Sequence, residues 1–365
     1  MAIENEQKSQ QIQTTESPET NVVHKRRVRY KGTHPKNFKE KYKELQPEKY
    51  KDDIAKVIER GSTPAGMHIS ICVNEILDFL QIKSGQKGLD ATLGYGGHTA
   101  KMLECLQGNG HIYGLDVDPI ELAKTKERLA HLGFGEDIVT PIELNFADID
   151  KVCEKVGKFD FILADLGVSS MQIDNPERGF SYKTEGPLDL RLNPLKGETA
   201  AERLLYISQA ELEGMLTENS DEPYAKEISK AIVLKIKSGT EINTTTKLAD
   251  IIADALKFIP QDQRKEAIKK SCQRTFQALR IDINCEFEVL YAFLEKLPNV
   301  LAKGGRVAIL TFHSGEDRLV KKSFKALFKD GIYCEIATDV IRPSAEECYT
   351  NSRAKSAKLR WAIKV

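Results

Sequence analysis

Short apolar runs alternate with helical segments along most of this chain. Residues 99–106 and 319–328 have the apolar spacing of amphipathic helices, and the runs between such segments are short and rich in β-branched residues. Because strands that alternate with helices form a sheet covered on both faces, the pattern predicts an α/β fold with a doubly wound, seven-stranded sheet. The predicted strands are 88–93, 111–116, 138–144, 159–165, 306–312, 332–340 and 358–365, of which the last two are expected to pair antiparallel.

A long segment without strand signals follows the fourth predicted strand, from about residue 175 to 287. Helical periodicity occurs in residues 200–207, 210–216, 225–236 and 248–258, and Thr244 to Thr246 supply an N-cap for the last of these helices. We therefore predict an all-helical substrate-recognition insertion at 175–287. The core then consists of residues 61–174 and 288–365, and residues 1–60 form a disordered, basic extension.

Length and composition are those of a globular cytoplasmic enzyme. The 365 residues exceed what one hydrophobic core usually organises, which agrees with a core and an insertion. No apolar run approaches the roughly 18 residues of a membrane span, and the polar N-terminus has no signal-peptide core. The seven cysteines are scattered without a C-x-x-C pair, which indicates reduced thiols and neither a disulfide framework nor a metal site.

The net charge is zero, but the charges are unevenly distributed. Between Lys25 and Lys43, nine Lys and Arg residues face one Glu, with Tyr30, Phe38 and Tyr42 interleaved among them. Such a segment can neutralise phosphates and stack on bases, which is typical of a nucleic-acid-binding arm. A solvated tail that only aids solubility is the alternative.

The segment from Asp90 to His98, DATLGYGGH, carries the clearest chemical signal. A strand runs into a glycine turn and a helix, and the next strand ends in Asp116, an arrangement that holds a ribonucleoside cofactor in α/β proteins. Glycines let the backbone approach a ligand, and the helix N-terminus offers unpaired N–H groups. The spacing departs from the G-x-G-x-x-G dinucleotide pattern, which favours S-adenosylmethionine over NAD. A purely structural glycine turn is the alternative.

Ligands of such sheets bind at the carboxyl ends of the strands, so the residues after Leu93, Asp116, Leu144, Asp165 and Phe312 are expected to line one cleft. Two polar loops belong to this edge. One follows Asp165 and the other is HSGEDR, residues 313–318, where Ser314 and Asp317 resemble a capping box that opens the next helix. For His313, a catalytic and a structural role both remain open.

Seven motifs together resemble the ribosomal RNA small subunit methyltransferase H (MraW-type) family from about residue 68 to the C-terminus. In order they are DATLGYGGHT, GLDVDP, ADLGVSSMQID, RGFSYKTEGPLDLRLNP, RTFQALRIDIN, LAKGGRVAILTFHSGEDR and NSRAKSAKLRWAI. The resemblance implies a class I S-adenosylmethionine-dependent methyltransferase that modifies the N4 amino group of a cytosine in the decoding region of small-subunit (16S) rRNA. It also implies that the cofactor contacts are Gly96, Gly97, His98, Asp116, Phe146, Asp165 and Gln172.

The chemistry of the implied reaction requires acceptors for the amino hydrogens of cytosine, and the loop from Asp165 to Ser170 is the natural place for them. The candidate catalytic residues are Asp165, Ser169 and His313. The chain departs from the family pattern at Gly315, where a leucine is usual, and in Asn351-Ser-Arg, which replaces Asn-Pro-Arg. These departures leave open a paralogue that methylates a different RNA cytosine. A NAD-dependent oxidoreductase would use the same strand, turn and helix, and a non-catalytic RNA-binding protein would account equally well for the basic arm.

Overall fold

The computed structural model describes residues 70–365, and the predicted basic arm and the rest of the extension at 1–60 lie outside the described residues. The core is one seven-stranded sheet with the order β3-β2-β1-β4-β5-β7-β6. Its strands are β1 (Lys87–Asp90), β2 (His111–Asp116), β3 (Val139–Glu143), β4 (Phe159–Asp165), β5 (Leu301–Thr311), β6 (Tyr333–Ile336) and β7 (Lys358–Lys364). All seven predicted strands are therefore confirmed.

The strand directions place a ligand site at the centre of one sheet edge. Strands β1 to β5 pair in parallel, whereas β7 runs antiparallel to both β5 and β6. The predicted antiparallel pair at the C-terminus is confirmed. The strand order reverses between β1 and β4, and ligands of open α/β sheets bind outside the carboxyl ends at such a reversal.

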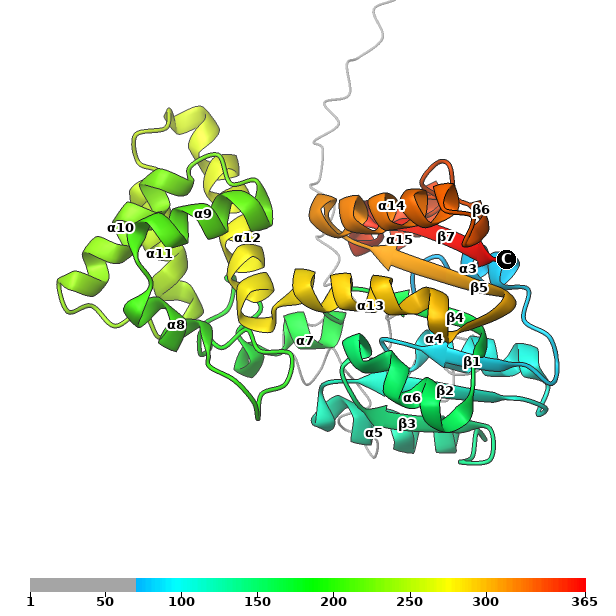
Figure 1. Ribbon diagram of the computed structural model, residues 1–365. Coiled ribbons are helices and arrows are strands. Elements are labelled where there is room, and N and C mark those ends of the chain that lie inside the picture. The colour runs from blue at the N-terminus through cyan, green and yellow to red at the C-terminus, as the bar shows by residue number, and fades with distance from the viewer. Residues whose placement is uncertain (1–69) are drawn as a thin grey trace, which may run out of the picture.

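Helices cover both faces of the sheet (Figure 1). One face packs against α6 (Ile149–Val156), α13 (Glu286–Val300) and α14 (Ser314–Lys329), whose buried side chains share one hydrophobic cluster with the strands. The other face packs against α3 (Val73–Leu80), α4 (Gly97–Leu106) and α5 (Pro119–His131). Shorter elements are α7 (Ser170–Asp174), α15 (Ala345–Thr350) and the 3-10 turns Phe146–Asp148, Pro176–Arg178 and Ser352–Ser356.

Five helices between β4 and β5 form a separate lobe beside the sheet (Figure 1). They are α8 (Ala200–Tyr206), α9 (Gln209–Ser220), α10 (Ala225–Lys237), α11 (Thr245–Ala255) and α12 (Gln261–Asn284). Buried residues of these helices and of the loops beside them form a third cluster, from Phe180 to Leu279. This distribution supports the division of the chain at 175 and 287, which stays a prediction. As predicted, Thr244 caps α11, since its side chain accepts from the Lys247 N–H.

Two long helices were missing from the sequence prediction. Helix α12 has 24 residues and α13 has 15, and they follow one another with only Cys285 between them, in a left-handed conformation with φ 49°. The apolar stripe of α12 is sparse because polar side chains occupy part of its inward face, so its periodicity is weak. None of the helices in residues 70–365 is long and apolar enough to cross a membrane.

Candidate active site

A cavity of about 800 Å³ opens at the carboxyl ends of the strands. It lies in the upper part of the range of roughly 300–1,000 Å³ that is usual for ligand pockets. Residues that follow five strands line it together, namely Gly94, Val117, Asn145, Leu166 and His313. The predicted cleft is thereby confirmed. The cavity also extends beyond the sheet to α12, so the core and the helical lobe share its walls.

The glycine turn and Asp116 form one hydrogen-bonded unit. The Asp116 carboxylate accepts from the Gly94 N–H through Oδ2 and from the Asp118 N–H through Oδ1, both at 2.8 Å. Burial raises the pKa of Asp116 to about 6, against the effect of these two N–H donors. The carboxylate is fixed at the cavity wall, and each oxygen keeps a lone pair that can accept from a ribose hydroxyl.

Two predicted cofactor contacts belong to the same turn. Gly97 lines the cavity, but Gly96 is buried and does not. Gly96 has φ 78°, and a Cβ there would lie 2.8 Å from Thr125 Cγ2. A glycine is therefore required at 96 to let the turn pack on α5, while Gly97 faces the ligand space.

Asp116→Ala is expected to weaken S-adenosylmethionine binding by about 2–3 kcal/mol, the scale of charge-assisted hydrogen bonds to a buried ligand. Calorimetric titration with S-adenosylhomocysteine measures this directly. Because Asp116 also holds the turn, Asp116→Asn is the control: it keeps the shape and one acceptor oxygen, and we expect a smaller loss. Wild-type affinity in the alanine variant with an intact fold would contradict the assignment.

Phe146 follows β3 and lines the same cavity as Asp116. Its ring packs edge-on against Phe293 with centroids 5.1 Å apart, so α13 fixes its position. Asn145 accepts from the Ala147 N–H and shapes the turn that presents the ring. This geometry suits a wall for an adenine ring, and the contact itself stays a prediction.

Asp165 and His98 face each other across the point where the strand order reverses. His98 Nδ1 lies 3.5 Å from Asp165 Oδ2, and His98 Nε2 lies 2.9 Å from the Ile71 carbonyl oxygen. A carbonyl can only accept, so Nε2 carries a proton. Nδ1 is the ring nitrogen that faces the Asp165 carboxylate.

The second carboxylate oxygen of Asp165 has no partner. Oδ1 is buried and lacks any hydrogen bond among the described residues, while the Asp165 N–H donates to Thr92 Oγ1 at 2.6 Å. Burial raises the pKa of Asp165 to about 6, with His98 opposing the shift and Asp90 and Glu316 adding to it. An unpaired buried acceptor in a ligand cavity is the kind of group that a substrate donor satisfies.

Ser169 and Gln172 form the capping box of α7. Ser169 Oγ accepts from the Gln172 N–H at 3.1 Å, and Gln172 Oε1 accepts from the Ser169 N–H at 2.9 Å. Both residues line the cavity. The capping role accounts for the position of the serine hydroxyl, and a catalytic role for Ser169 stays a prediction.

A buried ion pair, which the sequence interpretation missed, ties the segment after α7 to the turn between β2 and α5. Arg178 Nη1 donates to Asp118 Oδ2 at 2.6 Å, and Gln172 Nε2 donates to the same oxygen at 3.2 Å. Arg178 Nη2 also donates to the carbonyls of Arg191 and Leu192. Asp118 is fully buried, and its Oδ1 caps α5. Arg178 and Asp118 are 60 residues apart in the sequence, so no local sequence pattern predicts the pair.

The capping box predicted for α14 is wrong by one residue. The N-cap is His313 and not Ser314, and its partner is Glu316 and not Asp317. Asp317 pairs instead with Arg360 on β7, at 2.6 Å. His313 Nε2 lies 3.1 Å from Glu316 Oε1, so the ring is held by its own helix. This gives His313 a structural role at the cavity wall, and its catalytic role stays untested.

Gly315 lies close to Phe287 of α13. A Cβ at position 315 would lie 2.6 Å from Phe287 Cζ, and the Phe287 ring itself packs on the His313 ring with centroids 5.8 Å apart. The aromatic ring thus takes the room that a larger residue at 315 would need. The family usually has a leucine at this position, and in this chain Phe287 occupies the space that the leucine would need.

Gly315→Leu is expected to destabilise the fold by about 1–3 kcal/mol, the usual cost of overpacking. The double variant Gly315→Leu, Phe287→Ala should recover a large part of that loss, because it vacates the space. Urea denaturation of the single and double variants measures both effects. Equal stability of wild type and Gly315→Leu would show that Phe287 moves aside at no cost.

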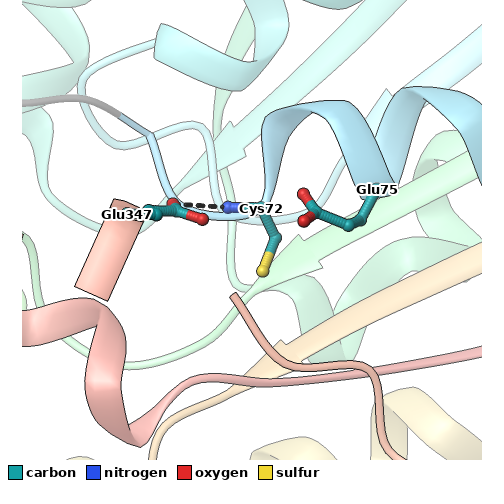
Figure 2. Close-up of side chains that lie close together, drawn as sticks. All are labelled: Cys72, Glu75 and Glu347. Carbon is teal, nitrogen blue, oxygen red and sulfur yellow. Dashed lines mark hydrogen bonds between the residues drawn. The ribbon is translucent and has the colours of Figure 1, made fainter. Parts of the chain in front are cut away.

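Two groups of side chains have the proximity of metal ligands. Cys72, Glu75 and Glu347 surround the start of α3 (Figure 2), where Glu347 accepts from the Cys72 N–H at 2.9 Å. Burial and the two carboxylates raise the pKa of the Cys72 thiol to about 12, so it stays protonated and is a poor ligand. In the other group, of Glu286, His313 and Glu316, the Arg280 guanidinium already pairs with Glu286. Neither group requires an ion.

The strand order 3-2-1-4-5-7-6, with an acid after β2 and a carboxylate at the strand-order reversal, defines a class I methyltransferase that uses S-adenosylmethionine. The chain belongs to the MraW methylase family, whose sequence profile matches residues 65–365. Family membership excludes the oxidoreductase. The cofactor is S-adenosyl-L-methionine.

Curated relatives agree with this family. The chain is 72% identical over 365 residues to "Ribosomal RNA small subunit methyltransferase H 1" of Lachnoclostridium phytofermentans, and the match covers 100% of both chains. A relative of the same name from Agathobacter rectalis is 66% identical, covering 93% of this chain and 98% of its own. "Ribosomal RNA small subunit methyltransferase H" of Solidesulfovibrio magneticus is 38% identical, covering 81% and 95%.

Proposed function

We propose that this enzyme transfers a methyl group from S-adenosylmethionine to the N4 amino group of a cytosine in the decoding region of small-subunit rRNA. The names of the relatives point to this substrate class. The observation that carries the chemistry is the unpaired Oδ1 of Asp165, a buried acceptor at the junction of the cofactor end and the lobe end of one cavity.

The proposed reaction makes specific demands on these side chains. The sulfonium methyl group is already activated, but the N4 lone pair is delocalised into the cytosine ring. An acceptor aimed at an amino hydrogen localises the pair and stabilises the positive charge that develops on nitrogen. Asp165 supplies this acceptor: its Oδ2 lies beside the His98 ring, which leaves Oδ1 for the amino hydrogen. The walls of the cavity hold nitrogen, methyl and sulfur in line.

A base can enter the cavity only if it leaves its stack, which is cheap in a flexible RNA segment. Helix α14 begins at the cavity wall and carries an exposed row of cations beyond its first turn. The row consists of Arg318, Lys321, Lys322, Lys325 and Lys329. Its spacing follows one face of the helix, and this face supports RNA as the partner. A ribosomal substrate implies a cytoplasmic enzyme.

Transfer of labelled methyl from S-adenosylmethionine to unmodified small subunits tests the proposal, with large subunits and already methylated small subunits as controls. Nuclease digestion of the product should yield N4-methylcytidine from one position. Label in a different cytosine would favour a paralogue with a shifted target. No label in any RNA would contradict the proposed function.

Deleting residues 1–60 is expected to raise the dissociation constant for RNA and to flatten its dependence on salt. Each phosphate contact contributes about 0.7–0.9 to the log–log slope, so the loss of a few cations from 25–43 is measurable. The affinity for S-adenosylhomocysteine should not change. An unchanged salt slope in the truncated enzyme would show that the arm contacts no phosphates.

A further inference from the structure

One face of α12 forms a wall of the cavity on the side of the helical lobe. Its cavity-lining residues are Gln273, Phe276, Gln277, Arg280 and Asn284. The steps of three and four residues between them place these side chains on one side of the helix. Since α12 belongs to the helical lobe, this face brings lobe side chains into the same space as Asp165.

The polar groups of this face are not equally available to a ligand. Asn284 is saturated, because it donates to the Leu190 and Arg280 carbonyls and accepts from the Leu192 N–H. Gln277 Nε2 donates to the Asn219 carbonyl. Gln277 keeps one amide N–H, Gln273 is exposed, and Arg280 is the only cationic side chain of this set.

Glu286 fixes the orientation of Arg280 but leaves some of its N–H donors free. Its Nε donates to Glu286 Oε1 at 2.7 Å and its Nη2 to Glu286 Oε2 at 2.9 Å, a bidentate pair that fixes the plane of the guanidinium. A guanidinium has five N–H donors, so three remain. Within the part of the chain that the structure describes, Nη1 has no hydrogen-bond partner. Burial would lower the pKa of Arg280, but Glu286 and Glu316 raise it, so the group stays charged.

Glu316 connects this guanidinium to the proposed acceptor. Its carboxylate raises the pKa of Asp165 and has its own pKa lowered by His313 and by Arg280, against the effect of burial. The geometry agrees, because Asp165, Glu316 and Arg280 line one cavity, and a carboxylate oxygen of Glu286, the partner of Arg280, lies within 4.8 Å of one of Glu316. A base in this cavity has an acceptor on the Asp165 side and donors on the Arg280 side.

Cytosine has the matching pattern along one edge. Its N4 amino group donates, and its N3 and O2 atoms accept. We propose that Arg280 is a specificity-determining residue, an inference that rests on the proposed function. Its free N–H groups donate to N3 or O2 of the target cytosine, while the N4 amino group faces Asp165. Glu286 is then a positioning residue, which holds the Arg280 guanidinium in the plane of the base.

Substrate analogues test this assignment in a chemical double-mutant cycle. The substrates are small subunits that carry, at the target position only, cytosine, an analogue with CH in place of N3, or an analogue with S, a weaker acceptor, in place of O2. For the wild-type enzyme, we expect at least one analogue to lower the single-turnover kcat/KM by about 10–100-fold, the range of one good contact to a base edge. For Arg280→Met, the same analogue should lower kcat/KM by less than about threefold relative to cytosine, because the contact is already absent.

Arg274→Met is the matched control, since Arg274 lies on the same helix but does not line the cavity. It should keep both the wild-type activity and the wild-type sensitivity to the analogue. Glu286→Gln should lower kcat/KM and reduce that sensitivity while leaving Arg280 in place. If an analogue lowers kcat/KM by the same factor in Arg280→Met as in the wild type, the proposal is overturned.

Two other roles for Arg280 give different results. If it bound the carboxylate of the cofactor, Arg280→Met would weaken S-adenosylhomocysteine binding, and the proposal would be wrong. If it bound an RNA phosphate, the variant would lose salt-dependent affinity equally with all three substrates, which also overturns it. Failure of the proposed function is distinguishable, because the wild-type enzyme would then not methylate unmodified subunits at all.

Discussion

Asp165→Asn is expected to lower the single-turnover rate of methyl transfer by about 10²–10³-fold, the usual loss when one preorganised electrostatic contact is removed from a transition state. The side chain keeps its size, so the cavity and the cofactor site should survive. The affinity for S-adenosylhomocysteine and for RNA should change far less than the rate. Rapid-quench measurements with enzyme in excess over small subunits separate these quantities.

The pH dependence of the rate provides a second test of Asp165. Because burial raises its pKa to about 6, the carboxyl is protonated below that pH and ionised above it. An acceptor must be ionised to stabilise positive charge, so the wild-type rate should fall as the pH is lowered through about 6. The asparagine variant should lack this step. Asp150→Asn is the control, because Asp150 lies on α6 outside the cavity. A normal rate in Asp165→Asn would place the acceptor elsewhere in the loop.

Arg178→Met is expected to lower the free energy of unfolding by about 3–5 kcal/mol, which is the cost of leaving one partner of a buried ion pair uncompensated. Asp118 is fully buried and would be left without its cationic partner. The carbonyls of residues 191 and 192 would lose their donor as well. Denaturant titration followed by circular dichroism measures the loss, provided that the transition stays two-state.

The double variant Arg178→Met, Asp118→Asn separates the charge from the packing. Asparagine keeps an oxygen that can cap α5 but carries no charge, so the double variant should lose clearly less than the sum of the single variants. Lys126→Met is the exposed comparison, since the Lys126–Glu136 pair lies at the surface, and we expect a change below about 1 kcal/mol. Additive losses at 118 and 178 would show that the ion pair is not the source of the effect.

The parts of the fold that local patterns encode could be predicted from the sequence. The strand before the glycine turn and the strand that ends in Asp116 are apolar runs with clear ends, and the parallel order then places their carboxyl ends at one cavity. Helix α12 was missed because polar side chains, Arg280 among them, stand on its cavity-lining face, where a core helix would carry apolar residues.

Other features could not be predicted from the sequence because they depend on distant residues or on uncommon local choices. Arg178 and Asp118 meet only after the lobe has folded against the core. At α14, the pair Ser314 and Asp317 satisfies the usual capping rule, but the helix begins one residue earlier, with a histidine cap. That register lets Asp317 reach Arg360 on the neighbouring strand, a partner that no local rule contains.

The short turn from Asp116 to Asp118 limits how far the two parts of the enzyme can be treated as exchangeable modules. The Asp116 carboxylate lines the cavity, and Asp118, two residues on, pairs with Arg178 of the inserted segment. A lobe transplanted as residues 175–287 alone would leave its anchor behind in the recipient core. A working chimera must therefore inherit Asp118 together with the lobe, and a change in the length of this turn would displace both the cavity carboxylate of Asp116 and the partner of Arg178.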